Sequence, residues 1–170
     1  MLRLLVAIAA LAVLTVLLLT PALAASPVLY ARATLVDANG NVVGFAKFVQ
    51  HRGRGVQVSV HASGLAPGNH GMHVHTVGAC SPTFLAAGGH FNPGGHLHGS
   101  HAGDLGNIRA NPDGRANMTR LASSFTLSGG PLSLFDADGS ALIIHAGADD
   151  LVTDPTGNSG ARVICGVIER

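Results

Sequence analysis

The stretch that decides the fold is residues 70–75, HGMHVH, in which apolar residues alternate with histidines. Successive side chains of a β-strand point to opposite faces of the sheet. A strand over Met72–Val77 would therefore direct Met72 and Val74 into the core and present His73 and His75 together on the other face. This pattern predicts a rigid strand that offers two imidazoles side by side.

Outside this stretch the chain consists of similar short alternating segments, separated by turn residues such as 38–41 and 111–114. It has no heptad pattern, no long amphipathic helix and no repeat. The pattern predicts an all-β domain, either a closed antiparallel barrel or a sandwich, with two long functional loops at 78–103 and 146–161. The expected strands are Val28–Asp37, Val42–Gln50, Val56–Ala62, Met72–Val77, Asn107–Ala110, Arg115–Leu121, Ala141–His145 and Arg162–Ile168.

Composition excludes several protein classes. The chain has 170 residues, of which 47% are hydrophobic and 11% charged, so it has too little charge for a charge-driven disordered protein. Its 23 glycines are too few for a collagen repeat. A formal net charge of +1 leaves no basic surface for nucleic acid. The length predicts a single domain.

Residues 1–24 have the composition of an export signal. Arg3 precedes an apolar run from Leu4 to Leu19, and small residues stand at Ala22 and Ala24. We expect cleavage after Ala24, which leaves a domain over residues 25–170 in the periplasm or outside the cell, without membrane attachment. The alternative is an uncleaved membrane anchor, although the run is near the lower length limit for a bilayer span.

The rest of the chain contains two cysteines, Cys80 and Cys165. An even number of cysteines in an exported chain indicates a disulfide rather than free thiols. The bond would tie a central loop to the C-terminal segment.

Further metal-binding residue types follow the HGMHVH stretch. His90, His96, His98, His101 and Asp104 stand within fifteen residues of one another, and His145 lies on an apolar segment. A single histidine in a loop is most often a solvated surface group. So many imidazoles together with a carboxylate indicate instead a site for copper or zinc.

The sequence resembles the copper–zinc superoxide dismutase family. The matching segments cover nearly all of residues 25–170 in the family's order; they are His70–His75, Gly89–Pro93, His101–Asn107, Ile144–Asp150 and Asn158–Ile168. The resemblance implies an eight-stranded antiparallel Greek-key barrel, which agrees with the strand pattern.

The resemblance also implies a role for each matching residue. Copper would be bound by His73, His75, His90 and His145, and zinc by His90, His98, His101 and Asp104, with His90 bridging the two metals. Asp149 would form hydrogen bonds near His75 and link one copper ligand to one zinc ligand. Arg162 would attract the anionic substrate, and Cys80–Cys165 would be the family's disulfide. His70 matches a structural position, whereas His51 and His61 match nothing and are expected at the surface.

This chain departs from the family pattern in four places. Met72 replaces the usual Phe, and His98 and His101 are only three residues apart. His96 is an additional imidazole that competes with His98 as the zinc ligand; the spacing of eight residues from His90 favours His98. The segment from Asp149 to Arg162 is short and has no lysine, whereas many relatives place charged residues there to guide substrate.

The activity implied by the resemblance is that of an enzyme, a superoxide dismutase. Copper would alternate between Cu(II) and Cu(I), converting superoxide to dioxygen and hydrogen peroxide, while zinc is structural. The alternative is a non-catalytic exported copper- or zinc-binding protein, a store or chaperone, on the same fold. The sequence leaves a homodimer open.

Overall fold

The computed structural model describes residues 28–170, which form eight antiparallel strands and one short 3₁₀ helix. The predicted export signal, residues 1–24, lies outside the described residues. The elements are β1 (Leu29–Asp37), β2 (Val42–His51), β3 (Gly55–Ala62), β4 (Gly68–His75), η1 (Phe84–Ala87), β5 (Asp104–Ala110), β6 (Ala116–Ala122), β7 (Ala141–His145) and β8 (Arg162–Val167).

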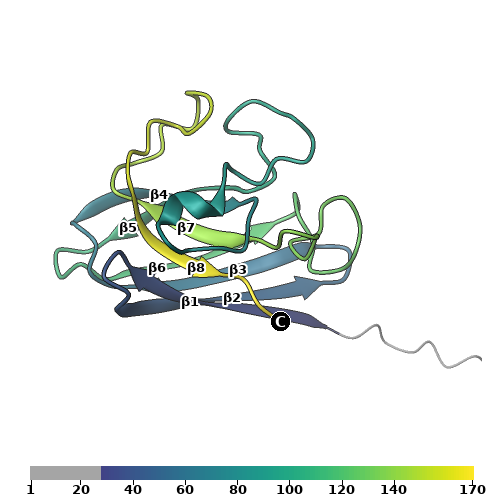
Figure 1. Cartoon of the computed structure of the whole chain (residues 1–170), viewed down its shortest axis with the longest axis horizontal. Helices are drawn as coiled ribbons and strands as arrows, with labels where there is room; N and C mark the ends of the chain where they lie inside the picture. The colour runs from purple at the N-terminus through teal and green to yellow at the C-terminus, as the bar shows by residue number, and fades with distance from the viewer. Residues whose placement is uncertain (1–27) are drawn as a thin grey trace, which may run out of the picture.

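The strands close into a barrel in the order β1-β2-β3-β6-β5-β4-β7-β8, and β8 pairs back with β1. Neighbours that are not consecutive, β3 with β6 and β4 with β7, give the Greek-key connection. The predicted all-β eight-stranded antiparallel barrel is therefore confirmed, and the sandwich alternative is excluded. Two long loops, residues 76–103 and 146–161, rise on the same side of the barrel (Figure 1).

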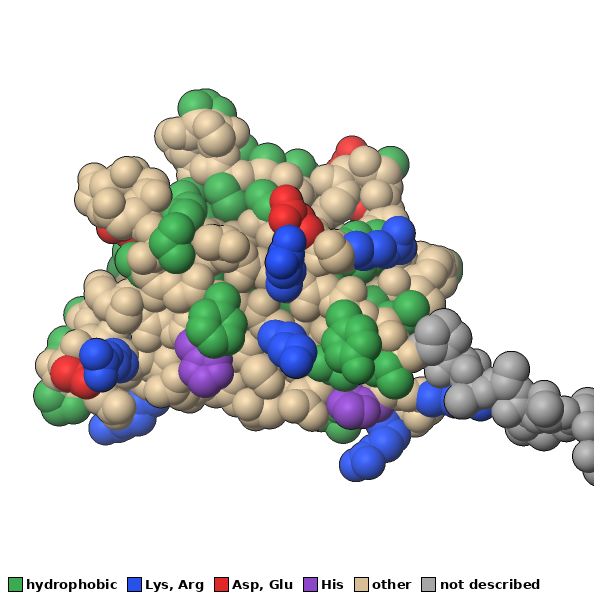
Figure 2. All heavy atoms as spheres, turned by 90° about the horizontal axis from the view of Figure 1, so that it is seen from below, with side chains coloured by type: hydrophobic (Ala, Val, Ile, Leu, Met, Phe, Trp, Pro, Cys, Tyr) green, Lys and Arg blue, Asp and Glu red, His purple; other side chains and the backbone are tan. Residues whose placement is uncertain are grey.

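The barrel interior is filled by every second residue of the strands. In β1 the inward residues are Ala31, Ala33 and Leu35; β2 contributes Phe48, which has no exposed surface. The outward residues of β1 and β2 form an open face on which apolar groups alternate with Lys and Arg (Figure 2). The alternation of inward and outward residues along β1 is the two-residue period that the sequence predicts for half-buried strands.

Strands β4 and β7 are buried on both faces, unlike β1 and β2. Met72 and Val74 of β4 point into the main core, together with Leu142 and Ile144 of β7. The opposite face of β7 packs in a second apolar cluster, made of Ala87, Ala141, Ile143 and Cys165. The loop that carries η1 therefore covers the outside of the barrel here and shields that face from water.

β4 and β5 begin three or four residues earlier than the sequence predicts. β4 starts at Gly68 rather than Met72, because Gly68 and His70 pair with Ala110 and Ile108 of β5. β5 starts at Asp104 rather than Asn107. Neither extension carries an apolar alternation, so the hydrophobic pattern alone could not reveal it. A third long connection, residues 123–140, was also not expected.

A disulfide joins Cys80 in the loop after β4 to Cys165 in β8, with the two Cα atoms 5.9 Å apart. This confirms the predicted crosslink. Within residues 28–170, no helix has both the length and the apolar character that a membrane crossing requires.

Phe48 and Phe45 test the assignment of the two faces of β2. Phe48→Ala should lower the free energy of unfolding by about 3–5 kcal/mol, because it removes a fully buried ring from the core. Phe45 is 55% exposed on the outer face of the same strand, so Phe45→Ala should cost less than about 1 kcal/mol. Urea unfolding of both variants measures the difference, and equal losses would contradict the assignment.

Candidate metal centre

The site is built on the outer face of β4 and β7, beneath the two long loops. His73 pairs with Ile143 and His75 with Ala141, so the two imidazoles lie on the face of β7 that also carries His145. A register shift between Ile144 and His145 brings His145 opposite Arg162 of β8. The rings of His73, His75 and His145 are almost completely buried, because the loops cover the strands. The strand pairing thus brings three imidazoles into one buried layer. They come from two strands that lie 65 or more residues apart in the sequence.

His90 reaches this layer from the first loop. It forms an isolated backbone bridge with His75, and its ring stacks on that of His73 with 3.9 Å between ring centroids. The nitrogens of His73, His75, His90 and His145 that could hold a metal lie within 4.8 Å of one another.

A second group of ligand atoms also lies within 4.8 Å of one another, and it shares His90 with the first group. Its members are His90, His98, His101 and Asp104. The Asp104 carboxylate lies 2.8 Å from His90 Nδ1, 3.4 Å from His98 Nδ1 and 3.3 Å from His101 Nδ1. His98 is buried in this group, whereas His96 is exposed and outside it. The geometry therefore favours His98, as the spacing from His90 predicted.

Hydrogen bonds decide which nitrogen of each ring is free. His75 Nδ1 donates to the Gly88 carbonyl at 3.0 Å, and His145 Nδ1 donates to the Gly160 carbonyl at 3.0 Å. Since a carbonyl can only accept, the proton is fixed on Nδ1 and Nε2 keeps its lone pair. These two Nε2 atoms are buried and have no hydrogen-bond partner in the described chain.

Asp149 fixes two further rings, one from each group. Its carboxylate accepts from His73 Nε2 and from His98 Nε2, each at 2.8 Å. The opposite nitrogens, Nδ1 of His73 and of His98, are buried without a partner among the described residues. The expectation that Asp149 links a ligand of each metal agrees with this geometry, but the expected position near His75 is wrong. Asp149 contacts His73, because the loop that carries it crosses β4 at Gly71, where a Cβ atom would lie 3.1 Å from the Asp149 Cβ.

Burial keeps three rings of the first group, His73, His75 and His145, neutral. Desolvation, with a smaller effect from the neighbouring His90, lowers the pKa of His73 to about 3. Desolvation also lowers the pKa of His75 to about 2, assisted by the charge of Arg162, and it lowers the pKa of His145. A neutral imidazole is the form that binds metal, so these three rings need not lose a proton at neutral pH.

The carboxylates of the site are held in their charged form. Burial alone would raise the pKa of Asp104, but the hydrogen bond from His90 and the nearby His101 and His98 outweigh it and bring the pKa to about 2. The pKa of Asp149 is lowered for the same reason, since His73 and His98 both donate to it. Each carboxylate can therefore act as an anionic acceptor.

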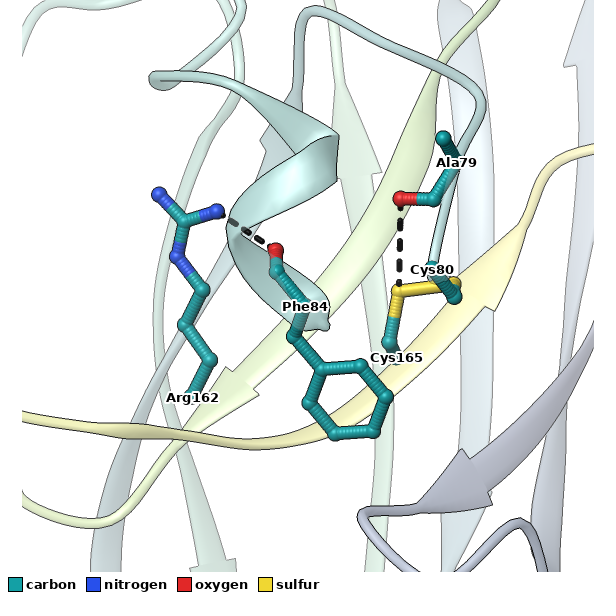
Figure 3. The surroundings of a disulfide bond; sticks show 5 residues. All are labelled: Ala79, Cys80, Phe84, Arg162 and Cys165. Atoms are coloured by element: carbon teal, nitrogen blue, oxygen red, sulfur yellow. Dashed lines mark hydrogen bonds between the residues drawn. A yellow bond between two sulfur atoms is a disulfide. The ribbon is translucent and has the colours of Figure 1, made fainter. Parts of the chain in front are cut away.

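Arg162 stands at the mouth of the site. Its guanidinium donates from Nη1 to the Phe84 carbonyl at 2.7 Å and from Nη2 to the Gly88 carbonyl at 2.6 Å. Figure 3 shows the side chain reaching toward η1, with the Cys80–Cys165 disulfide anchoring the same loop. Arg162 lines a cleft together with His90 and His101, so a fixed positive charge faces any anion that enters.

Two groups that hold site residues in position are not predicted by the sequence. The Gly88 carbonyl accepts from both His75 and Arg162, and nothing in a side-chain pattern can reveal a backbone acceptor. The Asn107 side chain exchanges two hydrogen bonds with the backbone of Asp149, at 2.9 and 2.8 Å. Asn107 stands at the end of the quoted segment His101–Asn107, which is the signal that could have singled it out.

The remaining histidines lie outside both groups. His70 is buried and its two ring nitrogens face the carbonyls of His145 and Ala66, at 2.8 and 2.7 Å, in agreement with a structural role. His61 is exposed on β3, as expected, and His51 is half-buried.

Comparison with known proteins agrees with this geometry. Residues 42–168 match the sequence profile of the family described as copper/zinc superoxide dismutase. The chain belongs to the copper/zinc superoxide dismutase family. It is 42% identical over 149 residues to "Superoxide dismutase [Cu-Zn] 2" of Aquifex aeolicus, an alignment that covers 82% of this chain and 86% of the relative.

Other members of the copper/zinc superoxide dismutase family have different names. The superoxide dismutase-like protein YojM of Bacillus subtilis is 41% identical over 143 residues, covering 79% of this chain and 73% of the relative. The crystal structure of a SOD-like protein from Bacillus subtilis superposes with a TM-score of 0.76 at 40% identity, covering 80% of this chain and 96% of that one. The family thus includes proteins named as dismutases and proteins named only as dismutase-like.

The buried imidazoles predict how the metal-free protein responds to acid. Burial lowers the pKa of His73 to about 3 and that of His75 to about 2 in the folded chain, whereas the pKa of an imidazole in the unfolded chain stays near 6.5. Below pH 6.5 the unfolded state therefore binds more protons than the folded state. As the pH is lowered, the free energy of unfolding should fall by up to about 1.4 kcal/mol per pH unit for each ring.

Thermal or urea unfolding of metal-free protein between pH 7 and 4 measures this slope. In His75→Gln, which keeps a polar side chain but cannot titrate, the slope should decrease by the contribution of one ring. Parallel curves for wild type and variant would show that His75 is not held neutral by burial.

Proposed function

We propose that this chain is a superoxide dismutase that binds one copper and one zinc ion. The observation that carries the proposal is a set of four imidazoles with fixed protons, those of His73, His75, His98 and His145. In each ring one nitrogen donates its proton to a carbonyl or carboxylate of the protein. The other nitrogen is buried and has no hydrogen-bond partner within the described chain. An unpaired buried nitrogen is costly unless a ligand satisfies it. Family membership supports the same assignment.

The two donor sets suit different ions. Four imidazoles, His73, His75, His90 and His145, suit copper, whereas three imidazoles with a carboxylate, His90, His98, His101 and Asp104, suit a tetrahedral zinc ion. His90 belongs to both sets and would offer Nε2 to copper and Nδ1 to zinc. Asp149 would hold one ring of each set in orientation, a role that outer carboxylates commonly have around metals.

Copper would supply the one-electron chemistry, taking an electron from one superoxide and giving an electron to a second, while zinc holds the site in shape. His90, whose Nε2 is buried and unpartnered within the described chain, would hold or give up a proton at that atom. Arg162, fixed by two carbonyls at the cleft, would attract and orient the anion.

The experiment that tests the proposal measures metal content and activity on the same sample. Protein reconstituted with both ions should contain one copper and one zinc per chain by elemental analysis, and it should accelerate the decay of superoxide in stopped-flow measurements. Protein loaded with zinc alone should be inactive, because zinc has no accessible second oxidation state.

Three variants refine this test. His145→Ala should lose copper, and His98→Ala should lose tightly bound zinc, whereas His96→Ala should retain both metals because its ring lies outside both groups. The similarity to a protein named only dismutase-like keeps a non-catalytic copper or zinc store as the second candidate. Full metal content without dismutation would establish that alternative.

Arg162 provides a separate prediction. Arg162→Ala should slow dismutation about tenfold, the low end for a steering charge, while both metals remain bound. Arg162→Lys keeps the positive charge but loses the two hydrogen bonds to the carbonyls. Its dismutation rate should therefore fall less than that of Arg162→Ala. If Arg162→Ala with full metal content retains full activity, Arg162 has no part in substrate attraction.

A further inference from the structure

His96 is an imidazole close to the site that neither proposed metal group includes. It lies in the first long loop and lines the cleft at the mouth of the site, together with His90, His101, Asp154 and Arg162. The cleft therefore combines members of a metal group with an exposed imidazole outside it.

The position of His96 is fixed by its neighbours. The side chain of Asn92 donates to the His96 carbonyl at 2.8 Å and accepts from the His96 backbone NH at 3.0 Å. The ring folds over Gly94, where a Cβ atom would lie 2.5 Å from His96 Nε2. Its ring nitrogens have no hydrogen-bond partner among the described residues, so they are open to a ligand from solvent.

The cleft is also the side from which an ion can reach the zinc group. His98 is buried against Asp149. Two other members of the zinc group, His90 and His101, line the cleft, and each is 7% exposed. The Asp154 carboxylate, which is 47% exposed, lies 3.6 Å from His101 Nε2. Asp154 would attract a cation on this side of the cleft, while Arg162 would repel it on the other.

We propose that His96 is a capture ligand for incoming zinc, a role that rests on the proposed function of the zinc group. A hydrated ion would exchange one water for an imidazole nitrogen of His96 at the mouth of the cleft. It would then exchange His96 and its remaining waters for the buried donors, beginning with His101. Each exchange replaces one ligand by another without a change of oxidation state, and His96 is free again at the end.

The test is the rate at which metal-free protein takes up Zn²⁺. Stopped-flow mixing with Zn²⁺ bound to a weak metallochromic indicator follows the transfer directly. His96→Gln should slow uptake severalfold, because the variant has no imidazole to hold the ion at the mouth of the cleft. The final content should remain one zinc per chain. The matched control is His61→Gln, which removes an exposed imidazole from the outer face of β3 and should take up zinc at the wild-type rate.

Several outcomes would overturn the capture role. Equal uptake rates for His96→Gln and wild type would show that ions reach the group without His96. Loss of the zinc ion at equilibrium would make His96 a resident ligand instead. A lower dismutation rate in fully loaded His96→Gln, with unchanged uptake, would place the ring in the substrate path.

The dismutase proposal fails separately from this one. Wild-type protein that takes up both metals but does not accelerate superoxide decay would refute dismutation, and slower uptake by His96→Gln would still support capture. Wild-type protein that binds no zinc would refute both.

Discussion

The buried carboxylate of Asp149 is the interaction on which the site depends. It accepts one hydrogen bond from His73 on β4 and one from His98 in the first long loop, so a single side chain in the second loop joins the barrel to both ligand groups. Asn107 of β5 in turn holds the backbone of Asp149 from both sides. A buried charge without such partners would be strongly destabilising, and this requirement keeps the two loops in one arrangement.

A second constraint acts at the other edge of the site. The Gly88 carbonyl accepts from His75 and from Arg162, so the orientation of a ligand ring and the position of the entrance charge depend on one backbone group. The Cys80–Cys165 bond ties the loop that carries Gly88 to β8, the strand that carries Arg162. The crosslink therefore contributes to the geometry of the site as well as to the stability of the fold.

The second loop offers the site little positive charge. The segment from Asp149 to Arg162 has acidic residues and no lysine, so Arg162 is its single basic residue. The Asp150 carboxylate accepts hydrogen bonds within its own loop, from the side chains of Thr153 and Asn158. Asp154 and His96 face the cleft, which makes its zinc side better suited to a cation than to an anion.

The sequence by itself determined the strand pattern and the residue types of the site. Alternation in segments such as HGMHVH defined which side chains enter the core, because the period of two is a local property of the backbone. The resemblance named His73, His75, His90, His98, His101, Asp104 and His145, and the structure brings all of them into two groups that share His90. The spacing of eight residues from His90 favoured His98 over His96, and the choice of zinc ligand stays a prediction.

Only the tertiary structure decided the contacts between segments distant in sequence. The pairing of Gly68–Gly71 with β5, the contact of Asp149 with His73 rather than His75, and the shared Gly88 carbonyl all join residues that no local pattern relates. Each depends on how closely two backbones approach, as at Gly71, where a side chain would collide with the second loop. Such distances follow from the closure of the whole barrel, which no single segment encodes.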